Sequence, residues 1–247
     1  MADSVQTCLV DGVLEVEICR PEVANALDPF AARDLMRAVQ EAAVDDGVVV
    51  VLLKGAGPRF CSGGDLKWVM RQEDPAAALR NLASELGAAC LALDRLEKPV
   101  VCAVQGSVAG AGLAIMLAAD YIIAEAETRF IYAYDAVGLS LDCGLSRSLP
   151  RSIGLHRALR FVYGREKLVA GQALEWGLVS EVVLGDALGS ARQIATGLAA
   201  GRHRGVGVSR MLLRSSRDVD PDQVVSREAR MISDLLLTAE SMKLRHK

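Results

Sequence analysis

The sequence predicts an α/β fold in which helices cover a parallel sheet. Apolar, β-branched runs at residues 48–54 and 100–104 are typical of strands buried on both faces. Each run is followed by a turn of small residues and then by a helical pattern, and such repeated units favour a parallel sheet. The chain has 247 residues, of which 51% are hydrophobic and 4% aromatic. It can therefore bury one sizeable core, built mainly from Ala, Val, Leu and Ile.

Local signals place the elements of the N-terminal half. Asp11-Gly12 lies between two alternating runs and predicts a hairpin. Asp28 followed by Pro29 predicts the N-cap and the first position of a helix. The expected strands span residues 7–10, 13–18, 48–54, 100–104, 121–124 and 129–132. The expected helices span residues 29–44, 66–70, 76–96 and 113–119.

From residue 144 onward the pattern is mainly helical. A short strand is expected at residues 178–183, and Gly185 opens an expected boundary between a core, residues 1–185, and a helical appendage, residues 186–247. The expected helices span residues 145–153, 155–163, 170–177, 187–200, 206–217 and 222–239. The appendage carries a basic run at Arg202, His203, Arg204, Arg210, Arg214 and Arg217. This run indicates either a solvated helix face or a phosphate contact to a nucleotide-bearing ligand.

Composition argues against several classes of function. The formal net charge of −3 gives no general reason to expect nucleic acid or membrane as a partner. No apolar run reaches the roughly 18 residues of a membrane span, and the first residues lack the features of a signal peptide, so a cytoplasmic protein is expected. The 6 cysteines form no C-x-x-C pair and the chain has only 3 histidines. Buried free thiols are therefore expected, with no metal site.

Two glycine-containing turns share one design. Residues 106–112 and residues 60–66 each follow an apolar strand and precede a helical pattern. The first amides of a helix lack internal partners, and glycine lets a ligand approach the main chain closely. Two such turns could direct two amides at one carbonyl oxygen, as in an oxyanion hole. Either turn taken alone is equally consistent with tight packing under another element.

Four motifs carry a family resemblance. R-P-x-x-x-N-A-L (20–27), F-C-S-G-G-D-L (60–66), K-P-V-V-C-A-V-Q-G-S-V-A-G-A-G (98–112) and W-G-L-V-S-E-V-V (176–183) resemble the crotonase superfamily of enoyl-CoA hydratases and isomerases. The resemblance implies a crotonase-type ββα-repeat spiral core with a helical C-terminal segment that builds homotrimers, often paired into hexamers. It also implies an acyl-CoA thioester as substrate and no further cofactor, since coenzyme A is part of that substrate.

The resemblance also assigns residues. The backbone amides of Gly64 and Ala111 would hold the thioester oxygen. The CoA passage would be lined by Ser62, Asp65, Leu66 and Lys67, with Ala24 and Ala26 near the adenine end. A thioester α-proton becomes easier to remove when two preorganised amides hold the enolate oxygen, each contributing about 3 kcal/mol.

The sequence departs from the hydratase pattern at both carboxylates. The two glutamates that position and activate water in the hydratases align with Ala114 and Tyr134. Asp142, in G-L-S-L-D-C-G (138–144), instead resembles the aspartate of the family's phenylacetyl-CoA branch, whose members act as isomerases, although Leu141 replaces that branch's proline. Asp142 could alternatively cap the helix that begins at Leu145. Asp135 is the reserve candidate for the catalytic aspartate.

The predicted function is therefore an enzyme that forms a thioester enolate and shifts an enoyl-CoA double bond, with Asp142 as the proton shuttle. Tyr134 is expected to contact the substrate. A hydratase with non-standard acid and base residues is one alternative. A non-catalytic member that binds acyl-CoA or RNA is another, but the overall acidity and the few aromatic residues argue against RNA.

Overall fold

The computed structural model describes residues 3–164, 167–201, 204–216 and 219–237. Within these residues a six-stranded sheet has the order β1-β2-β3-β4-β6-β9, in which only the β1–β2 pair is antiparallel. Its strands are β1 (Val5–Val10), β2 (Val13–Ile18), β3 (Val50–Gly55), β4 (Val100–Val104), β6 (Tyr121–Glu125) and β9 (Glu181–Val183). The prediction of an α/β fold with a mainly parallel sheet is confirmed.

A second, three-stranded sheet has the order β5-β7-β8. Its strands are β5 (Ser107–Ala109), β7 (Arg129–Ile131) and β8 (Leu168–Val169). The sequence predicted only a turn at residues 107–109. These residues become a strand because β7 lies parallel to them and offers backbone partners in register, Ser107 opposite Arg129 and Ala109 opposite Ile131.

The predicted helices form with small shifts at their ends. They are α1 (Pro29–Val44), α2 (Leu66–Val69), α3 (Pro75–Arg95), α4 (Ala111–Leu117), α5 (Leu145–Ile153), α6 (Leu155–Tyr163), α7 (Ala170–Trp176), α8 (Ala187–Gly201), α9 (Arg204–Ser215) and α10 (Pro221–Leu236), with 3₁₀ turns η1 (Pro21–Val23) and η2 (Asp135–Val137). The Asp28 carboxylate accepts a hydrogen bond from the Ala31 amide, as its N-cap position predicts. Helix α4 begins two residues earlier than expected, directly after Gly110.

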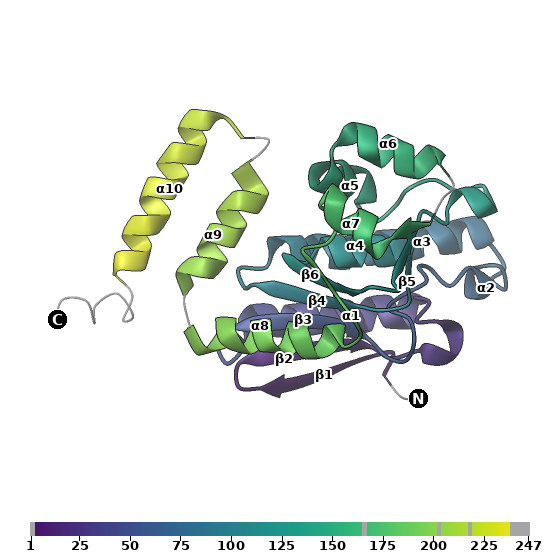
Figure 1. Ribbon diagram of the computed structural model, residues 1–247, viewed down its shortest axis with the longest axis horizontal. Helices are drawn as coiled ribbons and strands as arrows, with labels where there is room; N and C mark the ends of the chain where they lie inside the picture. The colour runs from purple at the N-terminus through teal and green to yellow at the C-terminus, as the bar shows by residue number, and fades with distance from the viewer. Residues whose placement is uncertain (1–2, 165–166, 202–203, 217–218, 238–247) are drawn as a thin grey trace.

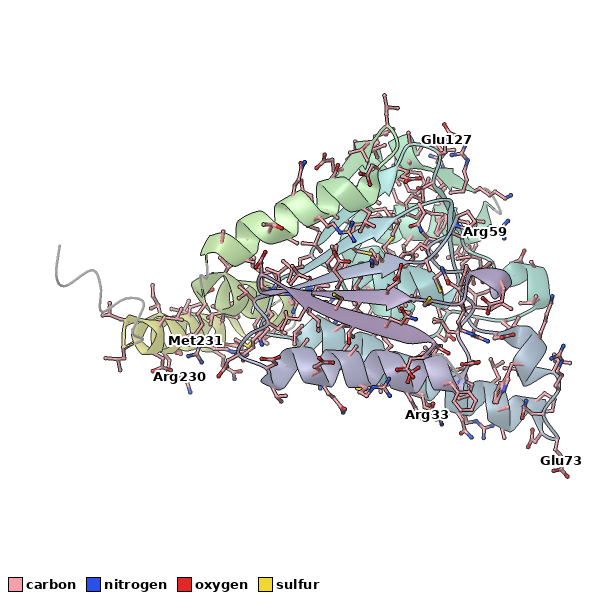
Figure 2. All side chains as sticks on the ribbon, turned by 90° about the horizontal axis from the view of Figure 1, so that it is seen from below. Arg33, Arg59, Glu73, Glu127, Arg230 and Met231 are labelled. Carbon is pink, nitrogen blue, oxygen red and sulfur yellow. The ribbon has the colours of Figure 1, made fainter. Side chains whose placement is uncertain are left out.

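Helix α8, predicted as the first helix of the appendage, packs on the sheet. Its alanines at positions 187, 191, 195 and 199 pack against one face of the sheet together with inward residues of β2, β3, β4 and β6. The larger core, which includes α1, α3 and α4, lies on the opposite face, and Figure 2 shows α1 and α8 on opposite sides of the strands. The first helix after residue 185 is therefore part of the core, because its small side chains cover the sheet.

Helices α9 and α10 extend away from the core as an arm (Figure 1). The arm is attached by Arg210, a side chain only 6% exposed, which pairs with Asp120 and donates to carbonyls at the C-terminal ends of α3 and α4. Arg214 pairs with Asp94 and Asp120. Neither arginine is a solvated side chain or a free phosphate contact, which corrects both readings of the basic run at these two positions. The remaining basic residues Arg202, His203 and Arg217 lie outside the described residues. Assembly of the chain into trimers or hexamers stays a prediction.

Candidate active site

The two glycine turns lie in direct contact. Ala109 N donates to Cys61 O at 2.9 Å, and Cys61 and Val108 form a parallel β-bridge. Gly112 is required beside this bridge, because a β-carbon there would stand 2.7 Å from Cys61 O. Gly110, with φ +53° and ψ −127°, turns the chain from β5 into α4. The backbone conformations that glycine permits thus bring residues 61–64 against residues 109–112.

The amides of Gly64 and Ala111 lie on these turns. Residues on either side of Gly64 pair with Leu27, through Leu27 N to Gly63 O and Asp65 N to Leu27 O, both at 2.8 Å. Within the described part of the chain, no hydrogen bond uses the amide of Gly64 or that of Ala111 as donor. Ala111 is also the first residue of α4, where intrahelical acceptors are lacking. Two unused donors therefore stand at two turns that touch.

The residues expected along the CoA passage form one strip beside these turns. Ser62 N donates to Ala24 O at 3.1 Å, and Leu27 bridges to Gly64, so the segment 24–27 runs beside 62–65. Ala24, Ser62, Asp65 and Leu66 are half-buried, Ala26 is buried and Lys67 is exposed. The structure brings these six residues together, and their contact with CoA stays a prediction.

Arg20 and Asn25 hold this strip in place, although the sequence patterns indicated no role for either. The Arg20 guanidinium donates to Ala26 O and pairs with Asp28 at 2.9 Å and with Asp65 at 3.3 Å. Asn25 Nδ2 donates to Ala56 O and Arg59 O at 2.8 and 2.7 Å. Both residues belong to the R-P-x-x-x-N-A-L motif, and this motif was the sequence signal that could have indicated their role.

Asp65 makes structural hydrogen bonds in addition to its predicted place along the CoA passage. Its Oδ1 accepts from the Trp68 amide at 3.0 Å and caps α2, while its Oδ2 faces Arg20. These two contacts fix the entry of α2 directly after Gly64.

Asp142 is held by Tyr134 rather than by a helix end. Tyr134 Oη donates to Asp142 Oδ1 at 2.6 Å, and the tyrosine is only 7% exposed. The N-cap of α5 is Gly144, which has no side chain to cap with, so the alternative of Asp142 as a helix cap is wrong. Asp135, the reserve candidate, is exposed in η2, whereas Asp142 is half-buried.

Cys90 of α3 and Cys61 of the first glycine turn are both buried thiols. Burial raises the pKa of the Cys90 thiol to about 12, and the nearby Asp142 carboxylate and Cys61 thiol contribute to the rise. Burial likewise raises the pKa of Cys61, which opens the turn, to about 12. At neutral pH both thiols therefore remain protonated.

The positions aligned with the hydratase glutamates hold no carboxylate. Ala114 is a buried residue of α4, and Tyr134 presents its phenol to Asp142.

Of the 6 cysteines, those at 61, 90, 102 and 143 are buried free thiols, as expected, whereas Cys8 is exposed. Among the described residues, no helix is both long and apolar enough to cross a membrane.

Comparison with known proteins identifies similar chains. The sequence model of the enoyl-CoA hydratase/isomerase family matches residues 9–244. The 1,2-epoxyphenylacetyl-CoA isomerase of Escherichia coli is 33% identical over 87% of this chain and 84% of its own length. The trans-2-decenoyl-[acyl-carrier-protein] isomerase of Streptococcus mutans is 38% identical over 70% of this chain and 66% of its own. The crystal structure of an enoyl-CoA hydratase from Polaromonas sp. JS666 is 29% identical, with a TM-score of 0.88, covering 95% of this chain and 92% of that one.

Proposed function

Since this chain belongs to the enoyl-CoA hydratase/isomerase family, we propose that within that family it is an isomerase. It would shift the double bond of an enoyl-CoA thioester through an enolate. One observation carries the choice of isomerisation: Asp142 is a half-buried carboxylate, while Ala114 and Tyr134 occupy the positions aligned with the two hydratase glutamates.

The proposed reaction needs one base and no activated water. The amides of Gly64 and Ala111 would bind the thioester oxygen and stabilise the negative charge that develops there. Asp142 would remove a proton from C2 and return it to C4, so that the double bond moves from C3–C4 to C2–C3. Hydration would require a second group that activates water, for which this site offers no carboxylate at the aligned positions.

The test is proton NMR of a 3-enoyl-CoA, and separately of a 2-enoyl-CoA, incubated with the enzyme in D₂O. We expect conversion of the 3-enoyl to the 2-enoyl thioester without a 3-hydroxyacyl product. Asp142→Asn removes the base and is expected to lower turnover by about 10²- to 10⁴-fold. Asp135→Asn is the matched control, because this exposed aspartate lies in the same connection between β7 and α5, and it should retain wild-type turnover.

Two results would contradict the proposal. A 3-hydroxyacyl product that persists in Asp142→Asn would mean that another residue activates water, and the protein would then be a hydratase with non-standard residues. Tight binding of acyl-CoA without turnover of either substrate would instead favour a non-catalytic member of the family.

A further inference from the structure

Asp142 makes a contact that proton transfer alone does not require. Tyr134 Oη lies 2.6 Å from Asp142 Oδ1 and donates a hydrogen bond to it. A phenol that donates to a carboxylate forms a charge-assisted hydrogen bond, which is shorter and stronger than a neutral one. The tyrosine ring is held in turn, since it is 7% exposed and lies 5.3 Å from the ring of Tyr132.

We propose that Tyr134 is a positioning residue that holds Oδ1 of Asp142 and leaves Oδ2 as the oxygen that takes up and returns the proton. The inference rests on the isomerisation proposed above. In the first step the C2–H bond breaks, an O–H bond forms at Oδ2, and the C2–H electron pair moves toward the thioester oxygen to give the enolate. In the second step the O–H bond breaks and a C4–H bond forms, so that no atom or electron is gained or lost.

The backbone around Asp142 is fixed, but its side chain needs a separate restraint. Cys143 and Gly144 follow with φ of +50° and +78°, and this turn lies on α3. A β-carbon on Gly87 would stand 3.6 Å from Cys143 Cα, and Cys143 Sγ lies 3.8 Å from Ala83 O. These contacts fix the backbone that carries Asp142 but do not reach its Oδ1. The Tyr134 hydroxyl restrains Oδ1 directly.

Tyr134 and Cys143, which both interact with the carboxylate, are neutral. Burial, followed by the hydrogen bond to Asp142, raises the pKa of Tyr134, so the phenol remains a donor. Burial and the same carboxylate raise the pKa of Cys143, and burial and this carboxylate also raise the pKa of the Cys90 thiol of α3. The donor therefore stays in place while the carboxylate gains and loses its proton.

The variant Tyr134→Phe distinguishes a steric role of the Tyr134 ring from a positioning role of its hydroxyl. The ring stays and only the hydroxyl is lost, so we expect kcat to fall by about 10- to 100-fold, the loss typical of a hydrogen bond to a charged group. KM should stay within about 3-fold, since phenylalanine retains the ring that is expected to contact the substrate, while the lost hydroxyl is bonded to Asp142. Tyr132→Phe is the matched control, because Tyr132 neighbours Tyr134 and its hydroxyl has no hydrogen bond to any described residue; it should keep wild-type kcat. An unchanged kcat in Tyr134→Phe, with Asp142→Asn inactive, would overturn the inference and leave the proposed function standing.

A second measurement does not depend on turnover. In protein labelled with ¹³C at the aspartate carboxylates, Asp142→Asn identifies the infrared carboxylate band of Asp142. We expect Tyr134→Phe to shift this band and Tyr132→Phe to leave it unchanged. Placing 3-fluorotyrosine, a stronger donor, at position 134 should shift the band in the opposite direction, and this variant serves if Tyr134→Phe does not fold. An unmoved band would overturn the inference. Absent turnover in the wild type would overturn the proposed function, and a shifted band would then support only the hydrogen bond from Tyr134 to Asp142 and not the proton transfer at Oδ2.

Discussion

A β-carbon on Gly63 would stand only 3.2 Å from the amide nitrogen of Ala111. It would also stand 3.1 Å from Ala109 O, and the residue has φ +100°, where side chains other than glycine's hydrogen are strained. The separation of the two turns that carry Gly64 and Ala111 is therefore set by the missing side chain at position 63. A change there alters the spacing of the two proposed oxyanion donors.

Gly63→Ala should lower kcat/KM by about 10²-fold or more, the loss typical of one misplaced oxyanion donor. The measurement is steady-state turnover of the 3-enoyl-CoA together with the melting temperature. Gly197→Ala is the control, since this glycine lies on the exposed face of α8 and a β-carbon added there would meet no atom within 4 Å. Alanine favours a helix over glycine, so the control should melt at the same or a higher temperature. Wild-type turnover in Gly63→Ala would exclude a strict spacing requirement.

Arg210→Ala should detach the arm formed by α9 and α10. The substitution removes a buried guanidinium from Asp120 and from the carbonyls of Leu93, Asp94 and Ala118. Leaving these acceptors without their donor should cost about 3 kcal/mol of unfolding free energy. Urea denaturation gives the free energy, and faster tryptic cleavage within α9 reports release of the arm. Arg204→Ala, at an exposed position of the same helix, should change neither, and equal proteolysis of both variants would argue against this anchor.

Glu15→Gln should weaken the attachment of α8 to the sheet in a pH-dependent way. Hydrogen bonding to Arg192, aided by Lys54 and opposed by burial, lowers the pKa of Glu15 from 4.5 to about 2. A carboxylate with a lowered pKa stabilises the fold above the pKa of its unfolded state, so its contribution is complete above pH 4.5 and is lost as the pH falls toward 2. Because the Arg192 side chain is 50% exposed, we expect a cost of about 1 kcal/mol at pH 7.

Urea denaturation of Glu15→Gln and wild type at pH 7 and pH 3 measures this contribution. The difference between the two proteins should shrink at the lower pH. Glu17→Gln is the matched control, since Glu17 lies on the same strand and its ion pair, with Lys54 of β3, is long at 3.8 Å; it should cost less. A difference independent of pH would mean that Glu15 acts through packing rather than charge.

Local patterns predicted the positions of most elements. Helices α5 and α6 lie where their apolar spacing placed them, and Asp28 caps α1 as expected. Two features were not predicted, because the deciding contacts are distant in sequence. Residues 107–109 pair as a strand with β7, and α8 packs on the sheet although Gly185 opens a plausible boundary before it. Neither partner can be read from the residues around these segments.

The sequence by itself determined the α/β class, the two glycine turns and the absence of carboxylates at positions 114 and 134, since these depend on residue types and local periodicity. Tertiary structure alone decided that the Asp142 carboxylate accepts from Tyr134 rather than capping α5, and that Arg210 anchors the arm. Hydrogen bonds of this kind join side chains 8 and 90 residues apart. Their existence depends on how loops and helices pack onto the sheet, which brings the donor and acceptor within reach only in the folded chain.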